Sequence, residues 1–72
     1  MTLCVGGELD GHVIEKERKF LKASETDPSF KTEYYKQIFN RDNINYQFWL
    51  PVGSNLHDMS KKVLEILRSP IN

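Results

Sequence analysis

Two runs rich in aromatic and β-branched residues, at 33–39 and 44–50, constrain this chain more than any other feature. The polar segment 40–43 separates them, and Pro51 ends the second run. Such residues favour strands, and a short polar segment between two of these runs favours a tight connection. The sequence therefore predicts a β-hairpin with strands near 33–40 and 44–51.

The register of that hairpin decides which side chains share a face. With an even-numbered connection, we expect Phe39 opposite Tyr46 and Tyr35 opposite Leu50; an odd-numbered one would change the alignment. Residues two apart on a strand point to the same side. The face expected to form the core then carries Tyr35, Phe39, Ile44, Tyr46, Phe48 and Leu50.

The N-terminal part predicts shorter strands separated by turns. Strands are expected near 2–6 and 11–16, joined by a turn that contains Gly6, Gly7, Asp10 and Gly11. A third segment, 18–23, is either a further strand or a continuation of the second. The segment 24–31 is rich in Ser, Thr, Asp and Pro, which predicts a loop.

The C-terminal part predicts a helix near 55–68. Apolar residues recur there at steps of three and four, which gives one apolar stripe: Leu56, Met59, Val63, Ile66 and Leu67. Ser54 or Asn55 can cap its start, and Pro70 follows its end. Because neither the stripe nor a sheet face can be buried alone, the helix should cover the sheet.

These elements predict one α+β domain over 1–72. Its expected architecture is an antiparallel sheet of four to five strands, made of two hairpins and one further short strand, packed by a single C-terminal helix. With 72 residues, such a core rarely supplies more than about 3–5 kcal/mol of stability without help. Association into a homodimer is one source of that help, and we retain it as an expectation.

Cysteine and histidine content argues against two other sources of stability. The single Cys4 excludes an intramolecular disulfide, and His12 and His57 lie far apart in the sequence. No pattern of metal-ligand spacing occurs, so we expect neither a metal site nor a cofactor.

Charge and hydropathy argue against two further classes of protein, namely those that bind duplex nucleic acid and those that bind or cross membranes. Ten acidic residues balance ten basic ones, whereas a grip on duplex nucleic acid or an anionic membrane needs a basic excess. No apolar run reaches the roughly 20 residues of a membrane span, and the N-terminus lacks the pattern of a signal peptide. We expect a cytoplasmic protein that binds no membrane.

The segment Gly6-Gly7-Glu8-Leu9-Asp10-Gly11 carries a resemblance. It is similar to the start of many small uncharacterised proteins of bacteriophages and prophages, which begin with a strand followed by Gly-Gly-x-Leu-Asp-Gly. Those proteins usually have a proline where this chain has Glu8. The resemblance implies an accessory phage protein acting inside a bacterial host cell, and it transfers no catalytic residue.

Three groups of residues invite a chemical interpretation, and a structural one is favoured for each. The glycines of the N-terminal turn match no phosphate-binding fingerprint, so turn geometry explains them. Cys4 beside His12 would suggest a hydrolase, but a lone strand cysteine is usually a buried apolar residue. His57 and Asp58 are neighbours on the predicted helix, where adjacent side chains point about 100° apart.

The outer face of the predicted hairpin is the strongest candidate site. It carries Trp49, Tyr34 and Ile38 next to Lys36, an apolar patch rimmed by polar groups. Such patches often mark interfaces, and Trp and Tyr contribute much of the binding energy there. The alternative is that the segment 24–31 or a chain terminus covers Trp49.

From this patch we predict a non-enzymatic module that binds a protein partner, from the host or the phage, through the exposed sheet face or an unpaired strand edge. The alternative function is binding of single-stranded nucleic acid or a nucleotide. It would use the same aromatic surface together with Lys36 and Arg41. The balanced charge makes a nucleic-acid partner the weaker prediction.

Overall fold

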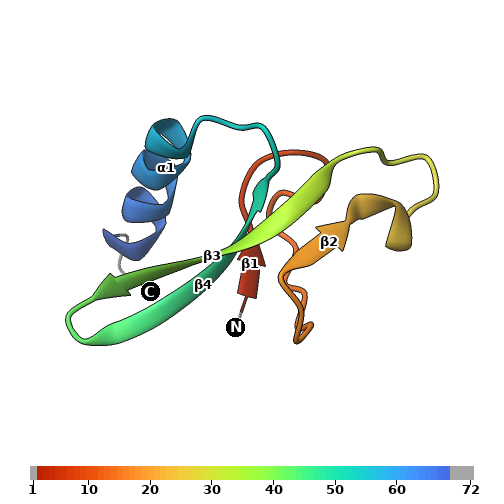
Figure 1. Ribbon diagram of the computed structural model, residues 1–72. Coiled ribbons are helices and arrows are strands. Elements are labelled where there is room, and N and C mark those ends of the chain that lie inside the picture. The colour runs from red at the N-terminus through yellow and green to blue at the C-terminus, as the bar shows by residue number, and fades with distance from the viewer. Residues whose placement is uncertain (1, 69–72) are drawn as a thin grey trace.

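The computed structural model describes residues 2–68. In chain order the elements are β1 (Thr2–Cys4), β2 (Phe20–Lys22), a 3-10 turn (Ala23–Glu25), β3 (Glu33–Arg41), β4 (Ile44–Pro51) and α1 (Leu56–Arg68). The strands form one sheet in the order β1-β4-β3-β2. Figure 1 shows α1 beside the turn end of the β3–β4 hairpin, whereas β2 lies towards the other end.

The α+β class and the single C-terminal helix agree with the sequence prediction, but the sheet is mixed rather than antiparallel. β1 runs parallel to β4, with Thr2 beside Gln47 and Cys4 beside Trp49. The first predicted hairpin is reduced to a single bridge between Leu3 and Val13, so 11–16 is not a strand. The 11–14 segment still occupies one edge of β1, where the main-chain N–H of Cys4 donates to the carbonyl of His12 at 2.8 Å, and β4 occupies the other edge.

The central hairpin has the predicted register. Phe39 lies opposite Tyr46, and Tyr35 lies opposite Leu50. Its connection is the two-residue turn Asp42-Asn43, whose φ angles are 53° and 64°. Positive φ at both central positions is the geometry of tight hairpin turns, and Asp and Asn adopt it more readily than most residues.

The helix begins one residue later than predicted. The side-chain Oδ1 of Asn55 accepts hydrogen bonds from the main-chain N–H of His57 at 2.9 Å and of Asp58 at 3.3 Å. Asn55 is therefore the N-cap, and it satisfies amides that the first turn of a helix leaves without partners. The hydroxyl of Ser54 instead donates to the carbonyl of Pro51, at 2.5 Å.

Apolar residues are buried on both faces of the sheet. On the helix side, a cluster of Val5, Phe48, Leu50 and Val63 is flanked by half-buried residues such as Tyr35, Phe39 and Tyr46. On the other side, Trp49 and Tyr34 pack with Cys4, Leu9, Leu21 and Ala23. The sheet is thus the middle of three layers, between α1 and the irregular N-terminal segment.

Candidate protein-binding surface

The aromatic patch predicted on the outer sheet face does not exist as a surface. Tyr34 and Trp49 are fully buried, so their predicted exposure is wrong. Of the four residues, Ile38 is 55% exposed and Lys36 is half-buried, with its Nζ 4.9 Å from the centre of the Trp49 ring. The Lys36 Nζ also donates to the carbonyl of Lys16, at 2.6 Å.

The N-terminal segment covers that face, and its contacts show how. The indole Nε1 of Trp49 donates to the carbonyl of Ile14 at 2.9 Å. The Tyr34 hydroxyl donates to the carbonyl of Gly6 at 2.7 Å and accepts from the main-chain N–H of Leu9 at 3.0 Å. Both rings are therefore held by main-chain groups of a segment without regular structure. Leu9, an apolar residue within the turn, was the sequence signal for this cover.

The glycine-rich turn is built to accept Tyr34. Gly6, Gly7 and Gly11 all have positive φ, and a Cβ on Gly7 would lie 2.4 Å from the Tyr34 hydroxyl. The carboxylate of Asp10 accepts from the main-chain N–H of Gly6 at 2.7 Å, which closes the turn. The structure thus places these four residues in a turn around an aromatic side chain.

Cys4 is poorly suited to act as a nucleophile. Its side chain is fully buried, and this burial, with a smaller contribution from the charge of Asp10, raises the pKa of its thiol to about 11. The thiolate, the reactive form, is therefore scarce at neutral pH. His12 turns its Nδ1 to the carbonyl of Leu9, at 3.1 Å.

Across residues 2–68, no group of three or more His, Cys, Asp and Glu side chains is arranged to hold a metal ion. Within the same range, no helix is both long and apolar enough to cross a membrane.

One concave surface of the described chain is a groove between the end of α1 and the edge of β4. Its volume is about 600 Å³. Most of its lining is apolar, from three elements: Leu3 of β1, Ile44, Tyr46 and Phe48 of β4, and Ile66 and Leu67 of α1. Thr2, Glu15, Asn45 and Gln47 add polar groups. Below, these ten residues are called the β4 groove.

The β4 groove lies along main chain that has no sheet partner. β1 pairs only with positions 47–49 of β4, which leaves 44–46 unpaired on that side within the described residues. The carbonyl of Trp49 accepts from the N–H of Val5, at 3.0 Å. Main-chain groups alternate in direction along a strand, so those of Asn45 point to the same open edge.

Sequence reasoning placed Ile44 and Tyr46 on the correct face but missed the groove. Ile44 was expected in the core and is 52% exposed. Ile44 is the first residue of β4, next to the hairpin turn, whereas the described pairing with β1 begins at Gln47.

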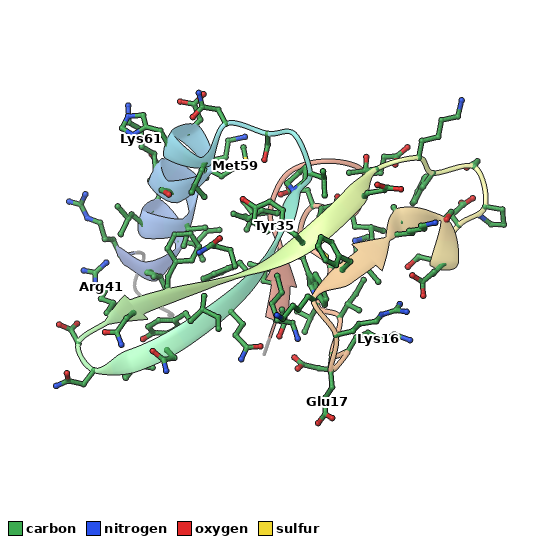
Figure 2. All side chains as sticks on the ribbon, in the orientation of Figure 1. Lys16, Glu17, Tyr35, Arg41, Met59 and Lys61 are labelled. Atoms are coloured by element: carbon green, nitrogen blue, oxygen red, sulfur yellow. The ribbon has the colours of Figure 1, made fainter. Side chains whose placement is uncertain are left out.

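Charged residues are spread over the molecule rather than gathered at the β4 groove. Figure 2 shows Arg41 at the turn end of the hairpin and Lys16 and Glu17 on the loop before β2, on the far side from α1.

Comparisons with known proteins add no assignment, since no family model, no curated protein and no solved structure matches this chain.

Proposed function

We propose that this protein is a non-enzymatic module that binds an extended segment of a partner protein in the β4 groove. The observation that supports it is an apolar groove that coincides with strand main chain at 44–46, for which residues 2–68 provide no sheet partner on that edge. Extended peptides bind such edges by adding a strand, and pockets for alternate side chains give the specificity.

The residues that line the β4 groove indicate which side chains the bound partner segment should carry. Tyr46 and Leu67 lie on the helix side of the added strand, whereas Asn45 and Gln47 lie on the other side of the sheet. Side chains alternate between the faces of a strand. The segment should therefore carry apolar residues at every second position, and polar residues between them.

The biological setting is proposed from the resemblance of the Gly6-to-Gly11 turn to phage and prophage proteins. In that setting the module is an accessory factor inside the bacterial cell, and its partner is a host or phage protein. Binding of single-stranded nucleic acid is less well supported, because buried rings cannot stack on bases and both Tyr34 and Trp49 are buried.

A model peptide tests the proposal by NMR titration. The probe is a capped peptide of alternating valine and threonine with lysine at each end. We expect chemical-shift changes at the amides of 44–48 and at Leu67 in α1. The result that would overturn the proposal is no change in the wild type, or changes confined to β3.

Two proline variants make a matched pair for this test. Asn40 and Asn45 face each other across the hairpin, and their side-chain amides share a hydrogen bond of 2.8 Å. Both variants lose that bond, and in both the proline replaces an N–H that points away from the β3–β4 ladder. Proline is tolerated at such edge positions. Asn45→Pro should abolish peptide binding, whereas Asn40→Pro should retain it.

A further inference from the structure

The other edge of the same hairpin is also open. β3 runs to Arg41, but β2 pairs only with its positions 33–35. The last contact on that side is the main-chain N–H of Lys36, which donates to the carbonyl of Lys19 at 2.8 Å. Beyond it, positions 37–41 of β3 have no strand partner on this edge in the described part of the chain.

The main-chain direction identifies which residues face this edge. Because the N–H of Lys36 points towards β2, the alternation along a strand places the main-chain groups of Ile38 and Asn40 on the same side. Those of Gln37, Phe39 and Arg41 point to β4. One outward carbonyl has a weak substitute partner, since the Gln37 Nε2 donates to the carbonyl of Ile38 at 3.3 Å.

This edge also lacks the usual devices that prevent pairing. Natural edge strands are protected by proline, bulges or charged side chains. Positions 37–41 contain no proline, the register with β4 runs through them without a bulge, and Arg41 at the end is the sole charge. The edge is therefore competent to accept another strand.

We propose that the occupant of this edge is a second copy of the chain, paired antiparallel about a twofold axis at Phe39. In this register Ile38 of one copy lies opposite Asn40 of the other. Each such pair exchanges both of its main-chain hydrogen bonds, so every outward-facing group at these two positions is satisfied. A register centred on Ile38 would require Lys36, which β2 already engages.

Charge favours self-pairing in this register. Arg41 of one copy lies opposite Gln37 of the other, and no two like charges face each other across the pair. Like charges directly opposite would destabilise a sheet. The whole chain has a net charge of zero, so two copies approach without long-range repulsion.

An exposed leucine on α1 extends the same interface. Leu64 is 45% exposed, and it lies about 160° around the helix from Ile66, which lines the β4 groove. Leu64 is therefore on the flank of α1 directed towards β3. A twofold axis perpendicular to the sheet puts both helices on one face of the joined sheet, where we expect the Leu64 flank of each copy to face the other.

The oligomeric state tests this proposal, measured by sedimentation velocity over a range of protein concentrations. We expect the wild type to form a dimer that dissociates on dilution, and Asn40→Pro to be a monomer. Asn45→Pro, the matched control, should dimerise like the wild type. Leu64→Lys should raise the dissociation constant at least tenfold. A wild type that remains monomeric at every concentration would overturn the proposal, and so would an Asn40→Pro dimer.

Amide hydrogen exchange on the wild type provides a test that requires no variant to fold. Protection at the amides of Ile38 and Asn40 should increase with protein concentration, while that at Asn45 should not. Equal behaviour of the two edges would contradict pairing through β3. Asn40→Pro tests the dimer and Asn45→Pro tests peptide binding in the β4 groove. Each proposal can therefore be contradicted without affecting the other.

Discussion

At the scale of single residues, the Tyr34 hydroxyl joins the sheet to its N-terminal cover. It bonds both the carbonyl of Gly6 and the N–H of Leu9, and its ring is fully buried between them. Burial is also the main reason that the pKa of this phenol is raised above its ordinary value. A buried polar group that loses its partner costs more than the bond itself contributes.

Tyr34→Phe should therefore lower the free energy of unfolding by about 1–3 kcal/mol, because two main-chain groups are left without their partner. Urea denaturation followed by Trp49 fluorescence measures this change. Tyr35→Phe is the control, since Tyr35 is half-buried on the helix side of the sheet. Equal losses in the two variants would contradict a special role for the Tyr34 hydroxyl.

At the scale of elements, the turn of the central hairpin sets the register of β3 against β4. Asn43 has a φ of 64°, in the left-handed region that glycine adopts without steric cost. We expect Asn43→Gly to stabilise the protein by about 0.5 kcal/mol, and Asn43→Val to destabilise it by at least about 1 kcal/mol. Urea midpoints of the two variants measure the difference, and indistinguishable midpoints would contradict this account of the turn.

The same elements show what the sequence could and could not predict. The hairpin and α1 depend on local patterns, namely the aromatic runs around the turn and the apolar stripe with its cap. The parallel pairing of β1 with β4 is not local, because it joins Thr2 to Gln47. The burial of Trp49 was not predicted, because the segment that covers it has no periodic pattern in the sequence. Likewise, the β4 groove combines residues of β1, β4 and α1, which lie far apart in the sequence.

At the scale of the whole molecule, the two sides of the sheet are unequally buried. The helix-side cluster contains four buried residues, of which only Val63 belongs to α1, whereas the opposite cluster contains six, with Trp49 and Tyr34 the largest. Regions with fewer buried apolar contacts open at lower free energy. The helix layer is therefore expected to be the less stable of the two.

Native-state hydrogen exchange in low denaturant measures this difference. Amides of α1 should exchange through an opening of lower free energy than amides of β3 and β4. Val63→Ala should widen the gap, because it removes the one fully buried helix side chain and leaves the Trp49 side intact. A single opening free energy for both layers would show one cooperative unit and contradict the prediction.

The parallel pairing of β1 also has a consequence for synthesis. β1 is synthesised first among the strands, whereas β4, its partner in the sheet, is synthesised last. The hairpin of β3 and β4 closes a short loop, whereas β1 must wait for a closure that spans most of the chain. During translation, Leu3, Cys4 and Val5 therefore have only their local contacts with the following turn, and they lack the cover of the hairpin until β4 has emerged.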